Sequence, residues 1–211
     1  MKTLKITIVL TIALGLGLML QSPSFAAVSS GAITVEATIP LLTQALNVTM
    51  VAIDPVTNTG WTTPVTTMQG FGGITPNFTD NILNAGRYYV VDVGAVDNSG
   101  TEWYITHTKS SIKRGVTTDN LDNNVNVSFM KTTKNPATGL TTDTLLFKKA
   151  FVDSAVTSST ALSKTVLSGG WLRIYYGIAT GVAADAPNTL PVPLDKRNGT
   201  YSGSVTITLS P

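Results

Sequence analysis

Apolar and polar residues alternate strictly in several segments of the chain, most clearly in the last one. After the turn signal Asn198-Gly199, the run 201–209 places Tyr, Gly, Val, Ile and Leu at the odd positions, with Ser and Thr between them. A period of two predicts a half-buried β-strand whose outer face carries hydroxyl groups. Because this strand closes the chain, we expect it to pair with a strand distant in sequence.

Similar runs predict the other strands. Arg87–Val96 is apolar on both faces apart from Asp92, which is typical of a central strand. The turn signal 97–100 predicts a hairpin between this strand and Thr101–Thr108. The other strand candidates are 31–39, 46–53, 125–131, 171–178, a weak edge strand or loop in 61–78, and 144–151, which the pattern leaves open as a strand or a short helix.

These segments amount to about eight to ten strands separated by turn signals. The spacing predicts an all-β fold, a single antiparallel immunoglobulin-like β-sandwich that occupies residues 27–211. No fixed-period repeat and no linker divides that span.

The first 26 residues have the pattern of an export signal. Lys2 and Lys5 precede the uncharged apolar run 6–20, and 21–26 supplies a proline and the small residues read by a signal peptidase. The run is shorter than the roughly 20 residues that a membrane-spanning helix needs. We therefore expect cleavage after Ala26, a mature chain with no membrane span, and a location in the periplasm, at the cell surface or outside the cell.

Removal of the signal changes the charge balance. The full chain has 14 Lys and Arg against 12 Asp and Glu, and the signal contains two of the lysines. The mature chain is therefore formally neutral and has no basic footprint for nucleic acid. The chain has no cysteine, which excludes disulfides, thiol catalysis and thiolate metal sites.

The sequence offers few groups for catalysis. His107 is the only histidine and alternates with threonines in a predicted strand, so we expect it to face solvent or a neighbouring hydroxyl. No Gly-x-Ser-x-Gly motif supplies a nucleophile. A carboxylate pair for glycoside hydrolysis would have to come from Asp92, Asp97 and Glu102. We expect no catalytic residue, no cofactor and no enzyme activity.

Two sets of residues are candidates for binding. Asp119 and Asp122 lie close together in a polar loop and offer the oxygen ligands that calcium prefers, although the glycine and terminal glutamate of a defined calcium loop are missing. A polar turn is the alternative. Trp61, Trp103 and Trp171 could form a stacking platform for sugars, whereas the strand patterns around the last two favour burial.

Three segments carry a resemblance to a known family: VVDVGAVDNSGTEWYIT, Pro-Val-Pro-Leu-Asp, and Gly-Thr-Tyr-Ser-Gly-Ser-Val-Thr-Ile-Thr-Leu. They resemble bacterial secreted β-sandwich proteins of the spore coat protein U and pilin-like type, most strongly over 171–211. The family's Gly-x-Tyr before the final strand corresponds to Gly199 and Tyr201. The resemblance implies an immunoglobulin-like subunit of a surface fibre or coat, assembled by a chaperone and an usher, although this chain lacks the family's cysteine pair.

These observations favour a non-catalytic structural or adhesive protein, such as a fibre or coat subunit. Its partners would be further copies or other surface subunits, and the alternating segment 27–39 could add a strand to a neighbour or complete its own sheet. The alternative is a carbohydrate- or surface-binding β-sandwich module, with a glycan as its ligand.

Overall fold

The alternating segments form strands in the computed structural model, which describes residues 45–96, 100–133, 143–168 and 170–211. These residues fall within one compact unit, Leu42–Pro211. The all-β prediction is confirmed, since strands make up 47% of the structure and helices 7%, and the sheets are antiparallel. The predicted signal 1–26, the predicted strand 31–39 and the turn residues 97–99 lie outside the described residues.

The described part of the chain contains twelve strands and three short helices. The strands are β1 Ala45–Ile53, β2 Ile74–Asn77, β3 Ile82–Ala85, β4 Tyr88–Val96, β5 Tyr104–Lys109, β6 Lys113–Arg114, β7 Val125–Thr132, β8 Thr144–Ala150, β9 Trp171–Ile178, β10 Val192–Pro193, β11 Tyr201–Ser202 and β12 Val205–Ser210. The helices are the 3-10 turns η1 Gly70–Gly72 and η3 Phe151–Asp153 and the single-turn helix α1 Lys164–Leu167.

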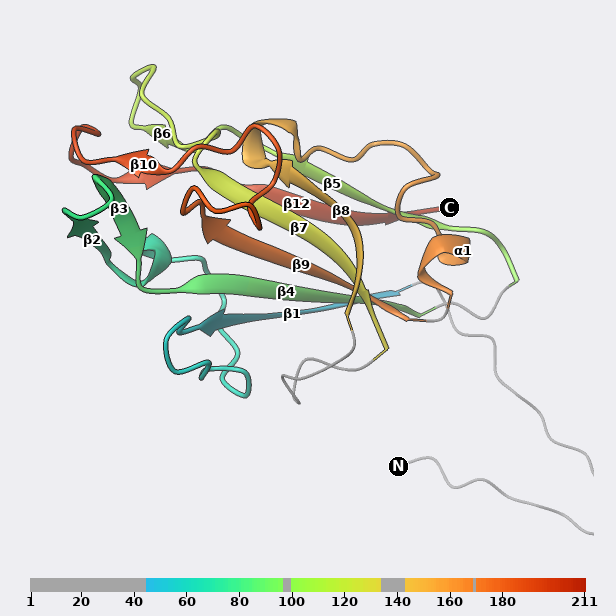
Figure 1. Cartoon of the computed structure of the whole chain (residues 1–211). Coiled ribbons are helices and arrows are strands. Elements are labelled where there is room, and N and C mark those ends of the chain that lie inside the picture. The colour runs from blue at the N-terminus through green and yellow to red at the C-terminus, as the bar shows by residue number, and fades with distance from the viewer. Residues whose placement is uncertain (1–44, 97–99, 134–142, 169) are drawn as a thin grey trace, which may run out of the picture. The chain divides into compact units, whose positions relative to one another are not determined.

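Five strands form the main sheet, in the order β1-β4-β9-β7-β8 (Figure 1). β4, β9 and β7 lie in its interior and have a neighbour on each side. β4 is apolar on both faces because both faces are covered: Val91 and Val93 are buried on one side, and Val90 and Asp92 on the other. The segment 144–151, which the pattern left open, forms β8 and the start of η3.

The predicted hairpin between 87–96 and 101–108 is wrong. β4 pairs with β1 on one side and β9 on the other, so neither edge of β4 is available to β5. β5 pairs instead with β12. A turn signal in the sequence reports only a local change of direction, and here the chain leaves the main sheet between the two strands.

β5 and β12 form a second layer over one face of the main sheet. Their pairing joins residues 102 apart in sequence, Thr106 and Thr208, which confirms that the closing strand pairs with a distant one. The core between the layers contains Val91, Val93, Ile105, Val127, Phe129, Leu172 and Ile174, and the β12 side chains Val205, Ile207 and Leu209 pack against it while remaining partly exposed.

The opposite face of the main sheet contains a buried ion pair. Arg173 donates to both carboxylate oxygens of Asp92, from Nε at 2.8 Å and from Nη2 at 2.9 Å, and both side chains are fully buried. A second carboxylate, Asp143, lies 3.3 Å from Nη1 and accepts a hydrogen bond from the Tyr175 hydroxyl at 2.6 Å. The ring of Trp61 covers the guanidinium at 5.4 Å.

Burial and pairing have opposite effects on this ion pair. Burial raises the pKa of the Asp92 carboxyl, and the hydrogen bonds from Arg173 oppose that rise. Burial lowers the pKa of Arg173, but the hydrogen bonds to Asp92 and the charges of Asp92 and Asp143 outweigh it, so this pKa lies above its ordinary value. Arg173 therefore stays charged, and Asp92 and Asp143 compensate its charge.

Candidate functional site

An apolar groove of about 1200 Å³ opens between the two layers. Val48 and Met50 of β1 form one wall, and Val205 and Ile207 of β12 form the other, with Val91 among the lining residues between them. Val48 is 50% exposed, so the groove opens to solvent along the edge of the main sheet. The alternation of apolar and polar residues predicts β1 and β12, the two strands that form these walls.

The remainder of the groove comes from segments with no periodic signal. The loop 65–71 and the residues Ile112, Leu121 and Phe151 complete the lining, and the segment 199–204 leads into β12. The backbone N–H of Val65 donates to Met50 O at 2.8 Å, which holds the loop against β1. The prolines and glycines of 61–78 predict an edge strand or loop there, but the sequence does not place that loop at a groove.

Within the described residues, one edge of β12 has no strand partner, and it lies beside the groove that Val205 and Ile207 line. His107 exchanges both of its backbone hydrogen bonds with Val156, on the side of β5 away from β12. His107 and its cross-strand partner Ile207 are therefore a non-hydrogen-bonded pair, and the N–H and C=O groups of Ile207 point away from β5.

The same alternation applies to Val205 and Leu209, whereas Thr206 and Thr208 bond to β5. Among the strands that the structure describes, only β5 pairs with β12. An unpaired edge beside an apolar groove is the arrangement that an added strand completes, because the strand supplies both backbone partners and apolar side chains.

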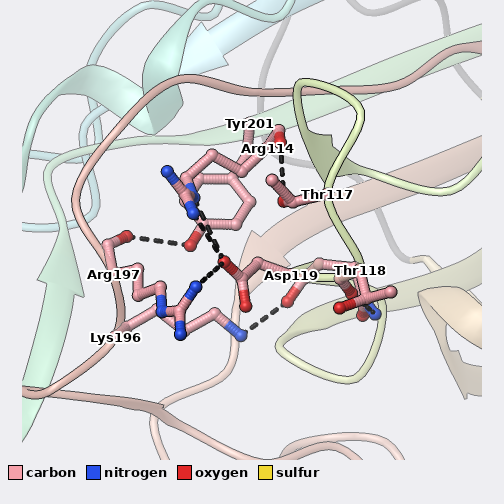
Figure 2. Close-up of polar contacts among 8 residues, drawn as sticks. Arg114, Thr117, Thr118, Asp119, Lys196, Arg197 and Tyr201 are labelled. Atoms are coloured by element: carbon pink, nitrogen blue, oxygen red, sulfur yellow. Dashed lines mark hydrogen bonds and ion pairs between the residues drawn. The ribbon is translucent and has the colours of Figure 1, made fainter.

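Asp119 lies in a cluster of cationic side chains formed by Arg114, Lys196 and Arg197 (Figure 2). Arg114 donates to Asp119 Oδ2 from Nη2 at 2.9 Å and from Nε at 3.2 Å, and Arg197 Nη1 lies 3.5 Å away. The hydrogen bonds from Arg114 hold the pKa of the Asp119 carboxyl below its usual range. This carboxylate therefore already has cationic partners.

Asp122, the second residue of the calcium hypothesis, has a different set of contacts. It accepts hydrogen bonds from Ser111 Oγ at 2.5 Å and from the Ile112 backbone N–H at 2.7 Å, and it is buried. The two carboxylates thus have separate hydrogen-bond partners, Arg114 for Asp119 and Ser111 and Ile112 for Asp122. No group of three or more His, Asp or Glu side chains that could hold a metal ion occurs in the described part of the chain.

The three tryptophans lie in separate places. Trp103 is only 5% exposed in the core, and the half-buried ring of Trp171 lies so close to Gly94 that a Cβ there would come within 2.8 Å of it. Trp61 is half-buried above Arg173. None of the three lines the groove between β1 and β12.

His107 is fully buried on the inner face of β5, so it faces a hydroxyl and not solvent. Its Nδ1 lies 2.8 Å from the backbone oxygen of Ser154, and its Nε2 lies 2.8 Å from the hydroxyl of Tyr176. A carbonyl oxygen can only accept, so Nδ1 carries the proton and Nε2 accepts from Tyr176. Both ring nitrogens are therefore committed to structural hydrogen bonds.

Comparison of the chain with protein-family models, with curated proteins and with solved structures finds no match. The described residues contain no helix of the length and apolar character needed to cross a membrane.

Proposed function

We propose that the mature chain is an exported, non-catalytic structural or adhesive subunit of a surface fibre or coat. A subunit assembles when the extended segment of a neighbouring copy adds a strand along β12. In this proposal the two layers are an immunoglobulin-like β-sandwich with one strand position open. The observation that carries the proposal is the solvent-exposed apolar groove beside an edge of β12 that pairs with no strand among the described residues.

The predicted strand 31–39 has the sequence that such a groove accepts. Ile33, Val35, Ala37 and Ile39 alternate with polar residues, so one face would enter the groove and the other would face solvent. A nine-residue strand spans about 30 Å, which exceeds the roughly 20 Å of the six residues in β12. Burial of each large apolar side chain contributes about 1.5–3 kcal/mol.

Val35→Asp is expected to weaken assembly by about 30-fold. Loss of one buried valine removes about 2 kcal/mol of apolar burial, and each 1.4 kcal/mol is about a tenfold change in affinity. Sedimentation velocity across a range of protein concentrations measures the change, and negative-stain microscopy shows whether fibres or lattices form.

Thr34→Asp is the matched control, because it adds the same charge to the opposite face of the same predicted strand. It is expected to assemble like the unmodified chain. A strictly monomeric protein at every concentration, or equal assembly of the two variants, would refute assembly by strand addition. A loss of stability without any change in assembly would show that the segment completes its own sheet.

A further inference from the structure

A second groove, of about 470 Å³, lies on the opposite face of the main sheet. Its side chains come from four adjacent strands, β4, β9, β7 and β8 (Figure 1). Asn126, Ser128 and Met130 of β7 line it, while Val127 and Phe129, the residues between them, belong to the core on the inner face. This groove is therefore separate from the groove between β1 and β12, and an inference from it does not depend on strand addition.

One row of side chains crosses the floor through Ser128. The sheet register places Ser128 opposite Tyr175 on β9 and opposite Lys148 on β8. The Tyr175 hydroxyl donates to Asp143 at 2.6 Å, which fixes its ring. Lys148 Nζ donates to Ala184 O at 2.7 Å and retains further protons. The row thus combines an anchored aromatic ring, a hydroxyl and an ammonium group.

The adjacent row contains Asn126 and Gly177, which lie opposite each other. Asn126 Oδ1 accepts from the Ala186 N–H at 2.9 Å, so its Nδ2 is directed away from that bond and is a donor. Gly177 adds no side chain to the floor, and the position of its missing Cβ lies in ordinary contact distance of the Tyr88 side chain, at 3.5 Å. The rings of Tyr88 and Tyr175 lie 6.1 Å apart and are tilted by 33°.

The chemistry of the lining selects among classes of ligand. Among the described residues, no carboxylate lines the groove, and the one lining cation, Lys148, already donates to a carbonyl, so neither strong cations nor polyanions find a matching charge. The tilted tyrosine rings do not form a parallel slot for a flat base. Aromatic faces, a glycine floor and a few neutral donors suit a ring that has apolar C–H faces and hydroxyls at its rim.

We propose that this groove binds a neutral sugar unit of a polysaccharide. The sugar ring lies against Tyr88 and Tyr175, and its hydroxyls bond to Ser128 Oγ, Asn126 Nδ2 and Lys148 Nζ. The glycan site therefore consists of tyrosines on the sheet face and not of the tryptophans that the sequence suggests.

The test is titration of the mature chain with four soluble probes, cellohexaose, maltohexaose, laminarihexaose and chitohexaose, followed by two-dimensional amide NMR. At least one probe is expected to shift the amide signals of Ser128, Asn126 and Gly177. Ser128→Ala and Tyr88→Ala are each expected to weaken that binding at least tenfold. Ser128→Ala removes only a hydroxyl, so it tests the site even where loss of the Tyr88 ring disturbs the fold.

Phe78→Ala is the control, because Phe78 is an aromatic residue that is 77% exposed and lies outside the groove. It is expected to bind the probe like the unmodified chain. Failure of all four probes at millimolar concentration would overturn the proposal. Binding that shifts other signals and is insensitive to both groove substitutions would overturn it as well.

Discussion

Asp92→Asn is expected to lower the free energy of unfolding by about 3 kcal/mol, because removal of the buried Asp92 charge leaves the buried guanidinium of Arg173 with one compensating carboxylate fewer, although Asp143 remains 3.3 Å from Nη1. Asp92 accepts two hydrogen bonds from Arg173, and both side chains are fully buried. The asparagine keeps the shape and one acceptor but removes the carboxylate charge that accepts from both Nε and Nη2 of the guanidinium. Urea unfolding at pH 7, followed by tryptophan fluorescence and circular dichroism, measures the change.

Asp119→Asn is the matched control. It makes the same chemical change in the ion pair with Arg114, whose side chains are 28% and 27% exposed. Water compensates a charge at such a position, so the urea midpoint is expected to move very little. An equal shift of the midpoint in the two variants would contradict the structural role assigned to the Asp92 pair.

Acidification is expected to destabilise the protein through His107. Burial lowers the pKa of His107 to about 4, from about 6.5 in an unfolded chain. Between these values the unfolded state binds a proton that the folded state does not, so the free energy of unfolding falls as the pH drops from about 6.5 to 4. Above about pH 6.5 this contribution is fully present. At pH 4.5 the loss is about 2.5 kcal/mol, at about 1.36 kcal/mol per pKa unit.

His107→Gln separates this effect from the titration of carboxylates. Glutamine does not titrate, so the difference in unfolding free energy between pH 7 and pH 4.5 is expected to shrink by about 2 kcal/mol relative to the unmodified chain. Urea unfolding at the two pH values measures it. If the two chains lose the same stability on acidification, His107 is not held neutral in the folded state.

The sequence predicts the strands of this protein better than their partners. Alternation identifies β12, and the double-sided apolar pattern identifies β4 as an interior strand. The partner of a strand depends on which other strands already pair with its two edges. The local sequence of the strand does not contain this information. The hairpin between β4 and β5 was wrong for this reason: β1 and β9 occupy both edges of β4.

Buried polar groups show the same limit. In the sequence, Asp92 is the one charged residue of β4, and Arg173 is the one charged residue of β9. Their ion pair depends on the register of the two strands, which only the fold supplies. The period of two likewise places His107 on one face of β5 without telling whether that face is covered.

The groove between β1 and β12 was predictable in part. Its strand walls follow from alternating segments, whereas the loop 65–71 and residues such as Ile112 and Leu121 have no periodic signal. The second groove was missed, because Tyr88, Ser128 and Gly177 come together only across three paired strands. The three tryptophans are candidates because tryptophan is rare and suited to stacking on sugars. Residue type alone does not tell whether such a side chain lines a groove.

Amide hydrogen exchange along β12 tests strand addition most directly. In the assembled mature chain, the amides of Val205, Ile207 and Leu209 are expected to exchange slowly, because a neighbour's strand accepts their hydrogen bonds. In the Val35→Asp variant these three are expected to exchange quickly, while Thr206 and Thr208, which bond to β5, stay protected in both. Equal exchange of the three edge amides in assembled chain and variant would contradict the account.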